Sequence, residues 1–596
     1  MNHFRILVLF LSLITPSIWA DQLGKQIKAV ENGLLPANVF KGDKPWTLHE
    51  RMKNYGVPGV GIAVIQDHKV VWFKTYGLAD RETGKIANNK TLFQAGSVSK
   101  PFAAFGALQL VEAGKLSLDA DVNSFLKSWK LPNNKFTAQA KVTLRHLLSH
   151  TGGVSVHGFG GYAEGKKVPT VLQVLEGSGP ANSSPVRVDK LPGEGFRYSG
   201  GGYTIAQLMM SDVTGKQFDD LLNEMLIKPL RMMQSTYNQP LPPNLLKHAA
   251  AGVLPDGVAV PGKRHIYPEM AAAGLWTTAN DLALFTIEMQ KALNGESQLI
   301  SKSMAETMAT PVDAGYGLGW GISKRGGSSY FSHGGWDEGF SSQLTSHMNN
   351  GDGVVVMINS NHPAFINEVV NAVAHTYSWD GYAVNEILAI PEELISKYTG
   401  RYRYNASSSI SITHQQGKLF MRYAGEKANE LLYTGDGLFM RRERTTPIIF
   451  TNNDDALQLN FVLGDGTYRP HIRLDKNVHL AADILEKGIY ADALTVYEKL
   501  LTESPSEASV SEGYLNNTGL SSMKDNSVYA IKILTMNTDL YPDSANTWDS
   551  LALAYQESGN IDKAIEHYHN ALKRDPKFAS ALKGVADLEN KKAQSK

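Results

Sequence analysis

The feature that most constrains the fold of this chain is a 34-residue repeat near its C-terminus. Each copy has a small residue where two helices would touch, with large residues and a proline around it. One copy carries Tyr514, Ala530, Leu534 and Pro542, and the next carries Trp548, Ala564, Tyr568 and Pro576. A weaker copy carries Ala493, Tyr497 and Pro505. A period of this length predicts helical hairpins stacked side by side, and about three repeats are needed for a stable stack.

This spacing matches the tetratricopeptide pattern, so residues 476–596 are identified as a tetratricopeptide repeat region, an all-α stack. Such a stack offers a surface for a protein partner or for self-association, and chemistry is not expected in it. An irregular helical tail is the alternative interpretation.

Two regions of different character precede the repeats. In residues 21–385, Val60–Ile65 and Lys69–Phe73 form a hairpin pattern, Phe102–Glu112 has helical spacing, and Gly353–Ile358 has the length of a strand. Strands at both ends with helices between them predict an α/β domain with one antiparallel sheet flanked by helices. Residues 391–475 alternate in short stretches between Gly and Asn turns, which predicts a small all-β module. The chain is therefore expected to be multidomain.

Composition excludes several classes of function. Lys plus Arg and Asp plus Glu both number 58, so the balanced charge gives no basic face for nucleic acid. The absence of cysteine excludes disulfides, thiolate catalysis and Cys-ligated zinc. The 17 histidines lack the clustered spacing of a metal site, and no cofactor is expected. Residues Gly160–Lys166 nearly spell a nucleotide-binding loop, but Lys167 stands where Ser or Thr is required.

A Ser-x-x-Lys motif at Ser97 and Lys100 is the candidate site for chemistry. The motif is weak by itself, since further copies occur at Ser124/Lys127, Ser521/Lys524 and Ser580/Lys583. Only Ser97 stands where a long apolar helix begins, with Pro101 in its first turn. A helix N-terminus favours developing negative charge, and a spacing of three brings Lys100 within reach of Ser97 Oγ. To accept a proton, Lys100 must be uncharged, which burial or a nearby cation would favour. The alternative is an N-cap serine beside a surface lysine.

The wider sequence resembles the serine β-lactamase and penicillin-binding protein superfamily, in particular its branch of class C β-lactamases, D-alanyl-D-alanine carboxypeptidases and esterases. The matching segments follow the family's order between residues 40 and 375: Leu92–Lys100, Thr143–Gly153, Tyr198–Gly200, Ala272–Thr278, Tyr316–Trp320 and His333–Gly335. The resemblance implies a β-lactamase/transpeptidase-like fold for residues 21–385 and a covalent acyl-enzyme on Ser97.

Each matched position takes a role from this resemblance. Ser97 would be the nucleophile, and Lys100 and Tyr198 would share the general-base work. Backbone N–H groups of Ser97 and Trp336 would form the oxyanion hole. The positions expected to line the substrate are Gly200, His333, Gly334 and Gly335. For Tyr198, the alternative is a structural role as a half-buried aromatic residue beside a Gly-rich turn. For His333, the alternative is a histidine in a strand whose hydrogen bonds are structural only.

Two positions depart from the family's pattern. Gly200 replaces an Asn, and His333 stands where dedicated β-lactamases carry Lys, which weakens a fixed positive charge at neutral pH. Both departures favour an enzyme that hydrolyses an ester, an amide or a D-amino-acid peptide over a specialised β-lactamase. The expected substrate is therefore a small molecule or a peptide. The alternative function is a catalytically weak penicillin-binding-like or scaffold protein that binds partners through its repeats.

The N-terminus predicts export. Arg5 precedes an apolar run from Ile6 to Ile14, and Ala20 offers a small residue for cleavage. The run is too short to cross a bilayer. Residues 1–20 are therefore expected to be a signal peptide, and the mature protein to be periplasmic or secreted from a bacterium without a transmembrane span. An uncleaved anchor is the alternative.

Overall fold

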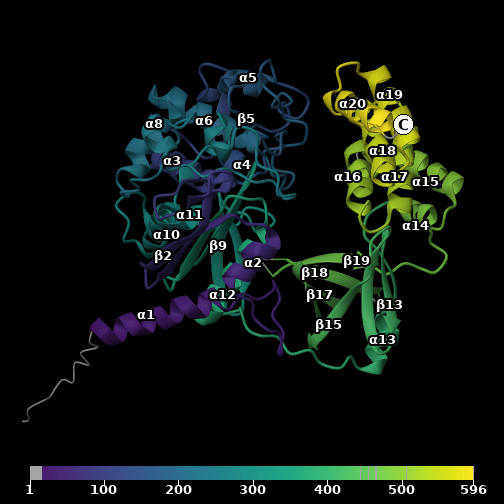
Figure 1. The fold of residues 1–596 in the computed structure, drawn as a ribbon, viewed down its shortest axis with the longest axis horizontal. Coiled ribbons are helices and arrows are strands. Elements are labelled where there is room, and N and C mark those ends of the chain that lie inside the picture. Colours follow the sequence, from purple (N-terminus) through teal and green to yellow (C-terminus); the bar gives the residue numbers. More distant parts are fainter. Residues whose placement is uncertain (1–15, 443, 454–455, 464–465, 505–506, 595–596) are drawn as a thin grey trace, which may run out of the picture. The chain divides into compact units, whose positions relative to one another are not determined.

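The computed structural model describes residues 16–442, 444–453, 456–463, 466–504 and 507–594 (Figure 1). The chain divides into two compact units, with the main boundary between Asn385 and Glu386. Of the predicted signal peptide, residues 1–15 lie outside the described residues, and residues 16–20 begin helix α1 (Pro16–Glu31). Among the helices of the described residues, none combines the length and the apolar character needed to cross a membrane.

A seven-stranded sheet forms the centre of the first unit, in the order β3-β2-β1-β11-β10-β9-β8. All neighbouring strands are antiparallel, as the sequence predicts. The strands are Gly59–Gln66 (β1), Lys69–Asp80 (β2), Lys85–Ile86 (β3), Gly321–Arg325 (β8), Ser328–Asp337 (β9), Phe340–His347 (β10) and Gly353–Ile358 (β11). Pairing of β1 with β11 closes the sheet from the two ends of the domain sequence.

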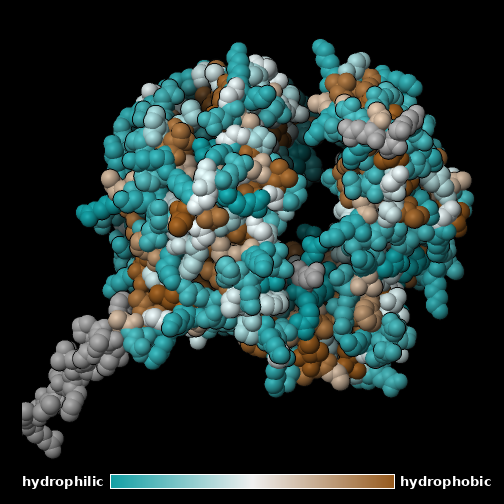
Figure 2. Space-filling view, in the orientation of Figure 1, coloured by the Kyte–Doolittle hydropathy of each residue, from teal (hydrophilic) through white to brown (hydrophobic). Residues whose placement is uncertain are grey.

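Helices cover both faces of this sheet because its central strands are apolar on both sides. On β1, Val60, Ile62 and Val64 pack in one cluster with α12 (Pro363–Thr376). Ala63 and Ile65 belong to the opposite cluster, with α3 (Ser99–Glu112) and α10 (Ala279–Asn294). Burial of these apolar side chains on both faces is the main driving force for the unit. The surface visible in Figure 2 is correspondingly hydrophilic for the most part, with scattered hydrophobic patches.

Short elements between the strands build the rest of the first unit. They are α2 (Leu48–Tyr55), β4 (Phe93–Gln94), η1 (Gly96–Val98), η2 (Val122–Ser124), α4 (Leu144–Leu148), β5 (Tyr162–Ala163), α5 (Val171–Glu176), α6 (Gly200–Thr214), α7 (Phe218–Leu222), η3 (Asn223–Ile227), α8 (Pro243–Leu246), β6 (His265–Ile266), α9 (Met270–Ala273), β7 (Trp276–Thr277) and α11 (Lys302–Ala309). Strand β4 pairs with β7, which brings the segment before Ser97 beside the segment after α9.

The second unit opens with an all-β near-barrel. Its eight antiparallel strands follow chain order, and Tyr402 on the first strand bridges to Arg473 beyond the last. Apolar side chains such as Phe439 and Phe450 fill the interior. The elements are α13 (Glu392–Tyr398), β12 (Gly400–Arg403), β13 (Ser409–Gln415), β14 (Lys418–Tyr423), β15 (Asn429–Gly435), β16 (Leu438–Arg441), β17 (Arg444–Asn453), β18 (Ala456–Val462) and β19 (Tyr468–Ile472).

Paired helices complete the second unit and carry the repeat. Ala530 and Ala564 are completely buried, as the small positions of the repeat predict, and Tyr568 is nearly so. Pro505 of the weaker copy lies outside the described residues. The elements are α14 (Ala481–Glu486), α15 (Tyr490–Glu503), η4 (Ala508–Val510), α16 (Glu512–Ser522), α17 (Ser527–Leu540), α18 (Ala545–Glu557), α19 (Ile561–Arg574) and α20 (Ala579–Gln594).

Ion pairs fasten the near-barrel to the first of these helices. Arg401 on β12 lies 3.0 Å from Asp483 on α14, and Ser409 Oγ donates to the same carboxylate at 2.8 Å. Arg422 on β14 pairs with Glu486, one turn further along α14. These contacts are partly buried, so solvent screens them less than it screens surface pairs.

Replacing Asp483 by Ala is expected to destabilise the second unit by about 1–3 kcal/mol, because Arg401 and Ser409 lose their acceptor. Calorimetric unfolding of the full chain measures the effect. Asp492→Ala, an exposed aspartate on α15, is the matched control and is expected to change little. Equal transition temperatures for the two variants would contradict the assigned contact.

Candidate functional site

The Ser–Lys pair meets at the start of α3. Ser97 lies in η1, the short turn that leads directly into α3, and Lys100 is the second residue of that helix. Lys100 is buried, and its Nζ donates to Ser97 Oγ at 2.8 Å and to the Ala272 carbonyl at 2.9 Å. The lysine is therefore aimed at the serine from a fixed position, whereas an N-cap serine beside a surface lysine would leave it exposed.

Strand β9 passes directly beside this turn. Gly96 has φ +53°, and a Cβ there would lie 2.5 Å from Trp336 N. A Cβ on Gly335 would overlap the Ala95 carbonyl. Glycine at both positions thus lets β9 approach the nucleophile segment, and the Trp336 backbone comes next to Ser97 while its side chain is half exposed.

Tyr198 lies between Lys100 and a buried histidine that the sequence analysis left without a role. Lys100 Nζ is 4.9 Å from the centre of the Tyr198 ring, and the His150 ring is 4.1 Å from it on centroids. The Ser199 N–H donates to His150 Nδ1 at 3.0 Å, so Nδ1 carries no proton. Burial, and then the charge of Lys100, lower the pKa of His150 well below its ordinary range. His150 is thus an uncharged support for Tyr198.

His333 is also uncharged, with both ring nitrogens engaged. Its Nδ1 donates to the Gly334 carbonyl at 2.7 Å, which leaves Nε2 to accept from the Tyr316 hydroxyl at 2.9 Å. Burial, followed by the charge of Lys100, lowers the pKa of His333 to about 3. This geometry fixes the ring and Tyr316, and contact of His333 with a substrate remains a prediction. Gly334 is exposed beside it.

Two buried carboxyl groups lie on segments that build the site, and no motif in the sequence pointed to either. Glu269 precedes α9, the helix whose Ala272 accepts from Lys100, and Asp337 follows Trp336 on β9. The carboxylate oxygens of both are buried, and no side chain of the described residues hydrogen-bonds to them. Burial raises the pKa of Glu269 to about 8 and that of Asp337 well above its ordinary range. Both groups therefore favour the protonated, uncharged form.

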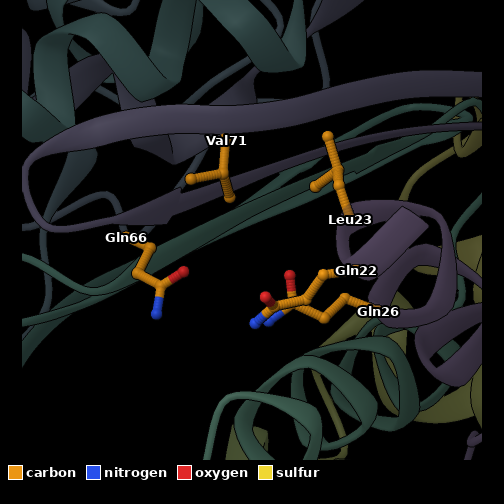
Figure 3. Close-up of a pocket in the computed structure, with 5 residues that line it drawn as sticks. All are labelled: Gln22, Leu23, Gln26, Gln66 and Val71. Atoms are coloured by element: carbon orange, nitrogen blue, oxygen red, sulfur yellow. The ribbon is translucent and has the colours of Figure 1, made fainter. Parts of the chain in front are cut away.

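A separate small hollow of about 100 Å³ is shown in Figure 3. Its lining side chains come from α1, β1 and β2 and are Gln22, Leu23, Gln26, Gln66 and Val71. None of these is ionisable or nucleophilic, so this hollow is not a second catalytic centre. Within the described residues, no group of three or more His, Asp or Glu side chains is arranged to hold a metal ion.

An antiparallel sheet covered by helices, with a serine and a buried lysine at the start of a central helix, defines a serine hydrolase superfamily. The family model described as Beta-lactamase matches residues 47–376, and the chain belongs to this family. A second family model, described as Tetratricopeptide repeat, matches residues 545–578, the helices α18 and α19. Both resemblances drawn from the sequence are confirmed.

Curated relatives are distant. Penicillin-binding protein 4* of Bacillus subtilis (strain 168) is 23% identical over 435 residues, which span 68% of this chain and 92% of the relative. A putative D-alanyl-D-alanine carboxypeptidase of Salmonella agona (strain SL483) is 24% identical over 384 residues, 54% of this chain and 85% of the relative. Among solved structures, the octameric penicillin-binding protein homologue from Pyrococcus abyssi is 22% identical with a TM-score of 0.49, covering 72% of this chain and 98% of the homologue.

The raised pKa of Glu269 predicts that the first unit loses stability as the pH rises. Below its ordinary pKa of 4.5 the carboxyl is protonated in both states, whereas between 4.5 and about 8 only the unfolded chain releases the proton. The free energy of unfolding then falls by about 1.4 kcal/mol per pH unit from this group alone. Glu269→Gln removes that contribution and is expected to flatten the pH dependence.

Urea unfolding from pH 5 to 8, followed by tryptophan fluorescence, measures this slope, because every tryptophan except Trp548 precedes Glu386. Glu296→Gln, at an exposed glutamate, is the control and should keep the wild-type slope. An unchanged slope in Glu269→Gln would show that Glu269 is ionised in the folded unit.

Proposed function

We propose that the protein hydrolyses an ester, amide or D-amino-acid peptide through a covalent acyl-enzyme on Ser97. The observation that carries this proposal is the 2.8 Å contact between Ser97 Oγ and Lys100 Nζ, with the lysine buried and held by the Ala272 carbonyl. A buried amine beside a hydroxyl is a base poised to remove the hydroxyl proton.

In the first step Ser97 Oγ attacks the carbonyl carbon of the substrate and its proton passes to Lys100 Nζ. To accept this proton, Lys100 must be uncharged at that moment. The backbone N–H groups of Ser97 and Trp336 are proposed to stabilise the oxyanion.

The tetrahedral intermediate then collapses and expels the alcohol or amine. The proton held by Lys100 returns to the leaving group by way of Tyr198, whose ring lies 4.9 Å from Lys100 Nζ. Water attacks the acyl-enzyme in the second half of the cycle, and the same groups remove its proton. No residue changes its net protonation over the full cycle.

The substrate class follows from what the site lacks. An uncharged His333 gives no fixed positive charge for a substrate carboxylate, and Gly200 gives no side-chain amide. Both features favour an ester or amide that needs neither contact. We therefore propose slower hydrolysis of penicillins than of simple aryl esters.

Ser97→Ala is expected to abolish labelling by a fluorophosphonate probe and all turnover of esters, since the nucleophile is gone. Intact mass spectrometry of the folded protein measures the adduct. Ser124→Ala removes the serine of a second Ser-x-x-Lys copy and is the matched control, expected to label like the wild type. Labelling of Ser97→Ala at the wild-type rate would refute the proposal.

Lys100→Met is expected to slow acylation of Ser97 by about 10²–10⁴-fold, the usual contribution of a general base. The rate of probe labelling over time measures this loss. Lys127→Met, in the second copy of the motif, should leave the rate unchanged. Acylation within twofold of the wild-type rate would remove Lys100 from the reaction.

The repeats support a second function that is compatible with the first. A tetratricopeptide match covers α18 and α19, and helical repeats of this kind form extended binding surfaces. We propose that the helical part of the second unit binds a protein segment or a second copy of the chain. Affinity purification with Ser97→Ala separates the roles, because binding through the repeats does not require an intact nucleophile.

A further inference from the structure

The loop that precedes Gly160 is built onto the first turn of α6, two residues beyond Tyr198. The Gly200 N–H donates to the His157 carbonyl at 2.9 Å, and the Gly201 N–H donates to the Val156 carbonyl at 3.1 Å. Ser199 Oγ donates to the Ser155 carbonyl at 2.8 Å. The loop therefore takes up the N–H groups that the start of a helix otherwise leaves free.

This docking leaves little or no room for a side chain at either glycine. A Cβ on Gly200 would lie 3.0 Å from the Phe159 ring and 3.2 Å from the His157 carbonyl. A Cβ on Gly201 would lie 2.7 Å from the Ser155 carbonyl. The half-buried ring of Phe159 thus fills the space into which a side chain at position 200 would project.

The backbone of the loop is strained where it meets α6. Val156 has φ +64°, a left-handed conformation that is costly for a β-branched residue. The next residue, His157, has its ring 5.0 Å from the Tyr198 ring on centroids. The contacts with α6 therefore hold an unfavourable conformation that brings the loop to the edge of the candidate active site.

The other side of the loop borders a hollow of about 570 Å³. His157 and Phe159 line it together with the segment 182–185. Its two charged lining side chains are already paired, Arg187 with Glu176 and Asp189 with Arg197. The hollow is therefore suited to an uncharged group.

Its uncharged lining is mixed in character. The Phe159 ring and Pro185 give it apolar surface. Its polar, uncharged lining residues include Asn182, Ser183 and Ser184. An acyl group with an aromatic or branched hydrocarbon end matches this lining.

We propose that Phe159, seated against Gly200, is the specificity-determining residue of the site, and that it selects substrates whose acyl group is uncharged and ends in an aromatic or branched hydrocarbon. The proposal rests on the acyl-enzyme mechanism of Ser97. It assigns to positions 159 and 200 one shared space, which either an aromatic ring from the loop or a side chain from α6 can fill, but not both.

Two p-nitrophenyl esters, phenylacetate and acetate, test the selection because they share a leaving group and differ only in the acyl group. The wild type is expected to show the higher kcat/KM with phenylacetate. Phe159→Ala should lower the phenylacetate-to-acetate ratio of kcat/KM by about tenfold or more, the effect of a lost apolar contact on discrimination. Phe159→Leu, which preserves bulk, should lie between the two. Phe136→Ala, at another half-buried phenylalanine of the same unit, should keep the wild-type ratio.

The shared space is tested by a double-mutant cycle that needs no turnover. Gly200→Asn alone should lower the unfolding temperature of the first unit because the new side chain meets the Phe159 ring. In Phe159→Ala the same substitution should cost markedly less, so the two changes are not additive. The proposal is overturned if the two substitutions change the unfolding temperature additively. It is also overturned if the phenylacetate-to-acetate ratio of kcat/KM stays within twofold of the wild-type ratio in both Phe159 variants.

Fluorophosphonate labelling of each variant separates this outcome from failure of the proposed function. If Ser97 is labelled but the ester ratio is unchanged, only the role of Phe159 is refuted. If wild-type Ser97 is not labelled and no ester is hydrolysed, the acyl-enzyme mechanism is refuted and the proposed selection falls with it.

Discussion

The buried amine of Lys100, held between Ser97 Oγ and the Ala272 carbonyl, is the interaction on which the first unit depends. A lysine amine can be buried this way only if acceptors are placed to receive its hydrogen bonds. This condition involves distant parts of the chain. The β4–β7 pairing brings the α9 region beside the nucleophile turn, and β9 closes the other side with glycines where it crosses the turn. The large sheet and its two apolar faces serve to hold these segments in register.

Electrostatics around this lysine form a consistent pattern. His150 and His333 are kept neutral by burial and by the charge of Lys100. Glu269 and Asp337 are kept protonated by burial. Burial thus favours the uncharged form of all four of these side chains.

The sequence predicted much of this arrangement, and the limits have physical causes. The hairpin at β1 and β2, the strand at β11, the helix after Ser97 and the repeat were predictable because each depends on local periodicity or a fixed spacing. Ser97 and Lys100 were singled out among four copies of the same spacing because an apolar helix begins there and segments resembling the β-lactamase family follow in order. Glu269, Asp337 and the part played by His150 were not found, because their properties arise from burial by segments distant in sequence. The contact of Phe159 with Gly200 was hidden for the same reason, since neither residue belongs to a motif with the other.

The ion pairs between the near-barrel and α14 have a consequence for the helical repeats. Repeat stacks need their terminal helices capped, because a helix made for stacking exposes an apolar face when it has no neighbour. Arg401 and Arg422 bind α14 to the strands, so the first helix of this part of the unit is held by the near-barrel. Gain or loss of whole repeats during evolution is therefore easier to accommodate at a distance from α14. There, neither Arg401 nor Arg422 would lose its ion-pair partner.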